Sequence, residues 1–375
     1  MVSIDEDCER VMGPSQIKKM PPISIPEIAP TVVANRLLPM TVKKWLTGLM
    51  AGLVLCGNTA AKPVVHTVSG PVAADELGTV LAHEHVLVDF VGADLVSPER
   101  YDRAEVIEKM LPFIEAAQAA GVETMVECTP MFIGRDSRLL AELSERTGMR
   151  FVTNTGLYGA VNDKFLPPYA WTETAEQLAD RWITEFRDGI DGTGIKPGFI
   201  KSAVDRDAEM SAVDAKLIHA AALTHLETGL TIAVHTGPGP GLAQLDILAE
   251  HDVAPSAWIW VHAQGAKDAD VLEAAKRGAW ISLDGIRGRS VDQHLSRILM
   301  LRATGHLDQV LISHDAGWYD PAKPNGGEPR GYTLLFEEMI PRLLGAGLSV
   351  AEIDQLLTTN PARALTVNVR RDNAL

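Results

Sequence analysis

From residue 64 onward, short apolar runs alternate with longer amphipathic stretches. The short runs consist mostly of β-branched and other apolar residues, a pattern typical of strands that are buried on both faces. The runs predicted as strands are 79–88, 122–128, 151–155, 198–203, 230–235, 258–262, 279–283 and 309–314.

The longer stretches have apolar residues at helical spacing and separate the predicted strands. Gly121, Gly148, Gly229 and Gly278 stand just before a strand, where a helix is expected to end and the chain to turn back. We predict helices over 103–120, 136–147, 174–188, 211–228, 241–251, 268–277 and 291–304, with a last helical region over 332–346 and 350–368.

Eight strands that are each followed by a helix predict an α/β fold, a (β/α)8 TIM barrel that occupies residues 62–375 as a single domain. A doubly wound sheet is the alternative, but it usually carries a Gly-rich nucleotide loop after its first strand. Here the first strand instead contains His83-Glu84-His85. The run over 237–241 is Gly-rich, but its prolines lack the N–H groups that a phosphate cradle needs.

The N-terminal 61 residues have a different character. Residues 1–39 show no periodic pattern and are predicted to be a disordered extension or a mis-called translation start. Residues 40–61 resemble a bacterial secretory signal peptide, because two lysines precede an apolar run and small residues follow it. The apolar run is too short to predict a stable membrane span. We therefore expect a periplasmic or secreted mature protein.

Composition and charge mainly exclude partners. The net charge of −15 argues against nucleic acid or an anionic membrane surface as the main partner. Removal of residues 1–61 would leave Cys128 as the one cysteine of the chain, which excludes an intramolecular disulfide in the mature protein.

Candidate metal ligands stand at the carboxyl ends of the predicted strands, which meet at one rim in a TIM barrel. His83 and His85 alternate with Glu84, so the two imidazoles face one side of the first strand and Glu84 faces the other. The later strands bring four further residues to the same rim: Lys201, His235, His262 and Asp315. Imidazole and carboxylate groups are metal ligands, so this joint pattern predicts a metal site.

The order of these residues resembles that of the amidohydrolase superfamily and, within it, the phosphotriesterase family, which includes lactonases and phosphotriesterase homology proteins. The resemblance covers about residues 66–368 of the chain. It is supported by the segments 78–85, 133–136, 155–158, 198–201 and 360–363.

The resemblance implies a binuclear centre of two divalent ions. His83, His85 and Asp315 would hold the buried α metal, and His235 and His262 would hold the more exposed β metal. Zn²⁺ suits such ligands, with Mn²⁺ or Co²⁺ as alternatives.

Two residues are candidates for the bridge between the ions. The resemblance implies Lys201, carboxylated on its side-chain nitrogen, because an ammonium cannot bind a cation whereas a carbamate offers two oxygens. Some phosphotriesterase homology proteins use a Glu on an early strand instead, and Glu127 stands in a similar context. The residues around Lys201 match the lysine-bridged pattern, so we favour Lys201 and expect Glu127 to be an alternative bridge or to lie beside the ligands.

The implied chemistry is attack by a metal-bridging hydroxide, with Asp315 as the catalytic residue that accepts its proton. We predict a zinc-dependent hydrolase that opens lactones or cleaves carboxylic esters. Phosphotriester, phosphate-ester or amide hydrolysis is the alternative. A non-catalytic binding protein on a barrel scaffold would show a broken ligand set, whereas here the set is complete.

Substrate contacts are predicted in the loops at the same rim. Tyr158, Trp318 and Tyr319 could form an apolar wall, and Arg287 or Arg330 could bind a carboxylate or phosphate of the substrate. We expect a small-molecule ester or lactone as the substrate, and the resemblance suggests a homodimer.

Overall fold

The structure is a computed structural model that describes residues 62–372. The predicted extension over 1–39 and the predicted signal peptide over 40–61 lie outside the described residues. Within 62–372, no helix combines the length and the apolar character that a membrane crossing requires.

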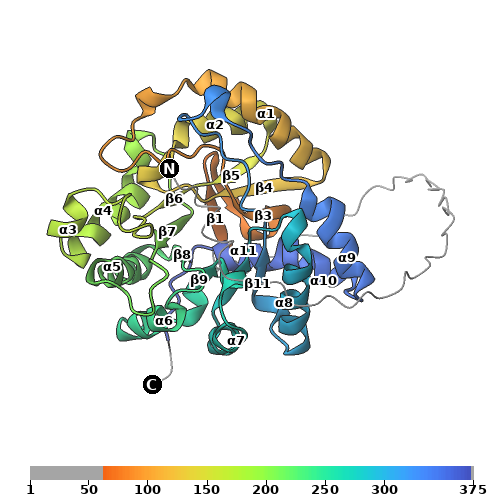
Figure 1. The fold of residues 1–375 in the computed structure, drawn as a ribbon. Helices are drawn as coiled ribbons and strands as arrows, with labels where there is room; N and C mark the ends of the chain where they lie inside the picture. The colour runs from red at the N-terminus through yellow and green to blue at the C-terminus, as the bar shows by residue number, and fades with distance from the viewer. Residues whose placement is uncertain (1–61, 373–375) are drawn as a thin grey trace, which may run out of the picture. The chain divides into compact units, whose positions relative to one another are not determined.

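Parallel strands with helices around them form the main body of the fold (Figure 1). Strands β3, β4 and β5 make one sheet, and β6 to β11 make a second sheet in sequential order. In chain order the strands are β3 (Thr79–Glu84), β4 (Val122–Glu127), β5 (Arg150–Val152), β6 (Asn154–Thr155), β7 (Phe199–Ala203), β8 (Thr231–His235), β9 (Trp258–Val261), β10 (Trp280–Leu283) and β11 (Val310–Ile312).

The two sheets join at both edges. Only Thr153 separates β5 from β6, so these two strands occupy one position in the ring. At the other edge, the segment after β11 pairs with β3: the N–H of Asp315 donates to the carbonyl of His83 (3.1 Å), and the N–H of His85 donates to the carbonyl of Ala316 (3.0 Å). These contacts close the ring, and the predicted (β/α)8 TIM barrel is confirmed.

The predicted helices follow the strands with small differences at their ends. Asp136, Thr174 and Ser211 were included in helices by the sequence pattern, but each is an N-cap whose side chain accepts backbone N–H groups of the first turn. The helices between strands are α1 (Arg103–Ala119), α2 (Ser137–Thr147), α4 (Ala175–Asp188), α5 (Ala212–Thr228), α6 (Gly241–Glu250), α7 (Asp268–Arg277) and α8 (Val291–Ala303).

The last helical region contains two π-helical turns and is interrupted at residues 346–349. It consists of η10 (Leu335–Met339), α9 (Ile340–Gly345), α10 (Val350–Asp354), η11 (Gln355–Thr359) and α11 (Asn360–Leu365). The loops also contain the short helix α3 (Tyr169–Thr172) and the 3₁₀ turns η1 (Ala74–Glu76), η2 (Pro98–Arg100), η3 (Met131–Ile133), η4 (Ile190–Gly192), η5 (Pro255–Ala257), η6 (Ala263–Gly265), η7 (Gly288–Ser290), η8 (Leu307–Gln309) and η9 (Pro324–Gly326).

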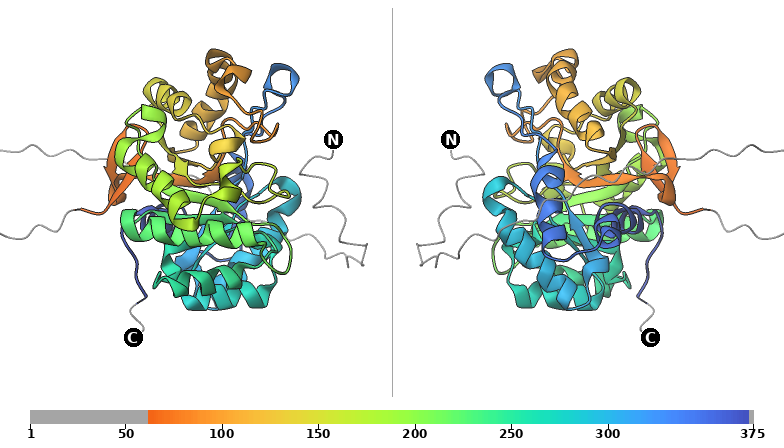
Figure 2. Two further views of the ribbon diagram at one scale, coloured as in Figure 1. Left: turned by 90° about the vertical axis from the view of Figure 1, so that its left-hand side faces the viewer. Right: turned by 90° about the vertical axis from the view of Figure 1, so that its right-hand side faces the viewer.

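An antiparallel hairpin that the sequence analysis did not predict precedes the barrel. It consists of β1 (Val64–Thr67) and β2 (Gly70–Ala73) and lies at one end of the barrel (Figure 2). Val65 of the hairpin and Leu365 of α11 are buried in the same apolar cluster as Phe199 of the barrel interior. The hairpin and α11 therefore cover the end of the barrel that lies opposite the strands' carboxyl ends.

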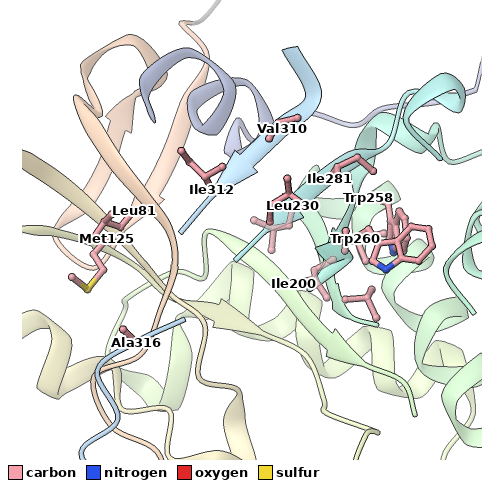
Figure 3. Packing of buried hydrophobic residues seen from close by; sticks show 14 of the residues in the cluster. Leu81, Met125, Ile200, Leu230, Trp258, Trp260, Ile281, Val310, Ile312 and Ala316 are labelled. Carbon is pink, nitrogen blue, oxygen red and sulfur yellow. The ribbon is translucent and has the colours of Figure 1, made fainter. Parts of the chain in front are cut away.

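The core has two layers because successive strand residues point to opposite sides. Met125 and Ile200 belong to the cluster between the strands and the helices, part of which Figure 3 shows. Their neighbours Val126 and Phe199 belong to the second cluster, inside the barrel. Lys201 is two residues from Phe199 and therefore shares its inward direction.

A test of this packing uses Gly156, which directly follows β6 at φ +119°. A Cβ at this position would lie 2.1 Å from the carbonyl oxygen of Lys201. At Gly121, with φ +99°, a Cβ would meet nothing within 4 Å. We expect Gly121→Ala to cost about 1–2 kcal/mol from backbone strain alone, and Gly156→Ala to cost at least about 2 kcal/mol more from overlap with β7. Thermal melts of both variants measure this, and equal losses of Tm would contradict it.

Candidate metal centre

Three ligand-type side chains from the first and last strands meet at the carboxyl end of the barrel. His83 lies in β3, His85 just beyond it, and Asp315 in the turn after β11. One ligand atom from each residue lies within 4.8 Å of the others, so this trio could hold a metal ion. Asp315 Oδ1 is 3.1 Å from Nε2 of His85 and 3.6 Å from Nε2 of His83.

Two members of the trio, His83 and Asp315, have the protonation states that metal binding needs. Burial and the charge of Lys201 lower the pKa of His83 to about 4, although Asp284 acts in the opposite direction. Burial raises the pKa of Asp315, but its contacts with His85 and His83 outweigh this effect and hold the pKa below its ordinary value. His83 is thus neutral and Asp315 ionised near neutral pH.

A histidine pair adjoins the trio. His235 ends β8 and His262 directly follows β9, and their ring centroids are 4.3 Å apart. The ring of His262 is also 5.2 Å from that of His83, so the pair and the trio lie side by side. Burial, together with the charges of His262 and Lys201, holds the pKa of His235 well below its ordinary value, which leaves this imidazole neutral.

Lys201 lies in the middle of β7 and is only 2% exposed. Among residues 62–372, no group accepts a hydrogen bond from its ammonium or forms an ion pair with it. Its charge lowers the pKa of both His83 and His235, so it lies near the trio and near the pair. A buried ammonium without a partner is costly, whereas a carbamate at this position could ligate cations on both sides. The residues present therefore fit the implied metal group.

Glu127, the other candidate bridge, is connected to His85 through Thr129. Its Oε1 accepts hydrogen bonds from the N–H of Val86 (3.1 Å) and from Oγ1 of Thr129 (2.6 Å), and its Oε2 accepts one from the N–H of Thr129 (3.2 Å). Nδ1 of His85 is 2.8 Å from the same Thr129 hydroxyl. Both oxygens of Glu127 are thus engaged, and Thr129 connects this carboxylate to the imidazole. Such a contact orients a ligand histidine.

Asp284, which the sequence analysis did not select, joins the two groups of histidines. It follows β10, is fully buried, and its Oδ2 lies 3.2 Å from Nδ1 of His83. Its Oδ1 is hydrogen-bonded to Nδ1 of His262, and Ser282 donates to Oδ2 (2.7 Å). The carboxylate holds a proton on Nδ1 of each ring and so leaves Nε2 free for a metal. Its position in the sequence could have indicated this role, because Asp284 directly follows a buried strand. Asp315 was selected on a similar position, close to the end of the last strand.

Two of the predicted substrate contacts adjoin the centre. The ring of Tyr158 lies 5.2 Å from that of His235, and the ring of Trp318 lies 5.8 Å from that of His85. Phe90 packs against Trp318 at 5.6 Å and extends this surface outward. An aromatic wall therefore covers one side of the candidate ligands.

Of the remaining predicted contacts, Arg330 adjoins this wall. Arg330 donates to the carbonyl of Asp315 and lies 5.8 Å from the Trp318 ring. Tyr319 does not join the wall, because its neighbour Trp318 faces the ligands while the Tyr319 ring packs against Gly326. Arg287 begins the turn after β10, where its N–H donates to Oγ of Ser290.

The comparisons with known proteins identify the family of the chain. The sequence model of the Phosphotriesterase family matches residues 63–365. The Phosphotriesterase homology protein of Escherichia coli (strain K12) is 32% identical over 295 residues, which cover 77% of this chain and 98% of that protein. The Aryldialkylphosphatase of Saccharolobus solfataricus is 30% identical over 305 residues, which cover 78% and 96%. A crystal structure of a variant PTE-like lactonase from Deinococcus radiodurans superposes with a TM-score of 0.72 at 28% identity and covers 80% of this chain and 99% of that one.

The TIM barrel, the candidate metal ligands at its carboxyl end and the family match together place the chain in the class of metal-dependent hydrolases. The chain belongs to the phosphotriesterase family, which includes phosphotriesterases and lactonases. The resemblance on which the sequence analysis relied is confirmed.

The role of Asp284 is tested by Asp284→Asn. An amide has one acceptor oxygen and cannot accept hydrogen bonds from both imidazoles as the two carboxylate oxygens do, so we expect metal affinity to fall about 10–100-fold. Competition against a chelator measures the affinity. The control is Asp246→Asn, which alters a largely exposed carboxylate paired with Arg277, and it should bind metal as the wild type does. Unchanged affinity in Asp284→Asn would contradict the assigned contact.

A second histidine pair lies away from the centre. Nδ1 of His219 in α5 is 2.8 Å from Nε2 of His251 at the end of α6. Burial and the charge of His219 lower the pKa of His251. Because the folded-state pKa lies below the unfolded-state value, the unfolded chain binds more protons on acidification, and stability is lost as the pH falls through that value.

We expect His251→Asn to lose less stability than the wild type between about pH 7.5 and about pH 5.5, since this window spans the ordinary histidine pKa. Urea unfolding at both pH values measures the difference. The control His306→Asn removes a ring that contacts the Gln309 amide and should follow the wild type. Parallel losses in His251→Asn and the wild type would refute the expectation.

Proposed function

We propose that this chain is a binuclear zinc-dependent hydrolase that opens lactones or cleaves carboxylic esters. The observation that supports it most is the meeting of two ligand groups around a buried, unpaired lysine. In this proposal His83, His85 and Asp315 hold one ion, and His235 and His262 hold the other.

Lys201 is proposed to bridge the ions as a carbamate. Its nearness to His83 of the trio and to His235 of the pair supports this role, because a group with two oxygens there could reach both. The engagement of both Glu127 oxygens with Val86 and Thr129 supports the assignment of Glu127 as an orienting group rather than the bridge.

The chemistry that two divalent ions supply in such a site is polarisation of the scissile carbonyl and acidification of the attacking water. Asp315 is ionised and lies at the rim, where a carboxylate oxygen can accept the proton of that water as its oxygen bonds to the carbonyl carbon. The ester C–O bond then breaks, and Asp315 returns the proton to the leaving oxygen. Cys128 has no part in this scheme, because its thiol is buried and burial raises its pKa.

The lining of the site favours esters and lactones. Tyr158 and Trp318 provide an aromatic wall, and Arg330 places a cation beside it. This mixed surface suits a compact substrate with a polar group better than a bulky neutral triester. The similarity to a PTE-like lactonase points the same way, and the similarity to an aryldialkylphosphatase favours phosphotriester hydrolysis as the second candidate.

The activity is tested by assaying zinc-loaded protein on a panel of lactones, aryl esters and phosphotriesters. We expect turnover of at least one lactone or ester by the wild type and none by Lys201→Ala, which lacks the bridging group. Faster turnover of a triester than of every lactone and ester would reassign the function to the second candidate. Equal rates for the wild type and Lys201→Ala on the whole panel would refute a hydrolase at this site.

Metal content and the carboxylation of Lys201 can be measured independently of activity. We expect about two metal ions per purified chain, and fewer than about one would count against the centre. Protein exchanged into isotope-labelled bicarbonate should show a carbamate carbon resonance that is missing from Lys201→Ala. A resonance of equal strength in both proteins would place the carbamate elsewhere.

A further inference from the structure

Glu84 stands between two of the candidate ligands but has no role in the site described so far. Its side chain is fully buried and faces the turn after β11. A carboxylate removed from water needs several hydrogen bonds to offset the loss of solvation. The groups that donate hydrogen bonds to Glu84 therefore indicate its structural role.

The partners of Glu84 lie on both sides of Asp315. Oε1 accepts hydrogen bonds from the hydroxyl of Ser313 (2.7 Å), the N–H of His314 (2.9 Å) and Nδ1 of His314 (2.7 Å). Oε2 accepts one from the N–H of Ala316 (2.8 Å). A single carboxylate thus binds the backbone immediately before and immediately after the candidate ligand.

Asp315 has a backbone conformation that needs such support. Its φ is +51°, in the left-handed region that glycine adopts freely and Asp adopts less readily. Its own N–H donates to the carbonyl of His83 (3.1 Å). The N–H groups of residues 314, 315 and 316 are therefore all bound to β3, the strand that also carries His83 and leads to His85.

His314 completes the arrangement and is not itself available as a metal ligand. Its Nε2 accepts a hydrogen bond from the N–H of Leu335 (2.9 Å). Its other nitrogen, Nδ1, therefore carries the proton and donates it toward Glu84. Both ring nitrogens are occupied, and the ring holds the start of η10 against the same carboxylate.

We propose that Glu84 is a positioning residue of the metal centre. It holds Asp315 in the left-handed conformation that directs the Asp315 carboxylate at Nε2 of His83 and His85. The inference rests on the proposed function, because it takes these three residues to be metal ligands. The middle residue of the tripeptide thus acts on the third ligand from the opposite side of the strand.

Glu84→Gln tests the proposal. The side chain keeps its shape, but its amide cannot accept hydrogen bonds from N–H groups on both sides of Asp315. We expect metal affinity, measured by chelator competition, to fall at least about tenfold. A wild type that binds no metal would overturn the proposed function, whereas equal affinity of a metal-binding wild type and Glu84→Gln would overturn this inference alone.

The matched control is Asp136→Asn, since Asp136 also accepts two backbone N–H groups, at the start of α2, together with Tyr101 and Arg103. This variant should lower Tm and leave metal affinity unchanged. If it weakens metal binding as much as Glu84→Gln does, the effect of Glu84 is general destabilisation and the proposal fails.

A double-mutant cycle with Asp315→Ala shows whether Glu84 acts through Asp315. In the Asp315→Ala background, adding Glu84→Gln should change metal affinity less than about twofold, whereas an additive loss would refute the mechanism. If Glu84→Gln does not fold, Ser313→Ala removes one of the four hydrogen bonds instead. It should weaken metal binding measurably at a Tm near that of the wild type, and unchanged affinity would overturn the proposal.

Discussion

The pairing of β3 with the segment after β11 is the constraint on which the candidate site depends. It closes the barrel, and it also brings His83 and His85 to Asp315 from the far end of the sequence. The backbone hydrogen bonds that make the closure are made by the ligand residues themselves or by their direct neighbours. Fold and site are therefore not separable at this edge, because the contact that completes the ring also completes the trio.

Buried carboxylates provide the second level of organisation. Glu127 reaches His85 through Thr129, and Asp284 contacts both His83 and His262. Glu84 binds the backbone on either side of Asp315. Because each carboxylate is buried, it requires hydrogen bonds and so fixes the groups that supply them. The candidate ligands are consequently held by hydrogen bonds to buried carboxylates, in addition to the backbone pairing of the strands.

The sequence predicted the strands and helices closely because their periodicities follow from backbone geometry. It also placed Lys201, His235 and His262 at one rim, since the carboxyl ends of parallel strands meet there. It did not reveal the contacts of Asp284 with two histidines or the hydrogen bonds of Glu84 on either side of Asp315. Those contacts join residues that are distant in the chain, so no local pattern records them. It also grouped Tyr319 with Trp318, whereas these adjacent side chains face different parts of the molecule.

By itself, the sequence determined the alternating elements, the barrel that they form and the rim where the chemistry gathers, because these depend on spacing along one chain. The tertiary structure alone decided which buried carboxylate contacts which histidine. It also decided that Glu127 is connected to His85 through Thr129, while Lys201 lies unpaired near both ligand groups. The register between strands is one such tertiary feature. It shifts between Leu81 and Glu84, and such a shift changes which neighbours a side chain meets without changing the pattern of residues that encodes the strand.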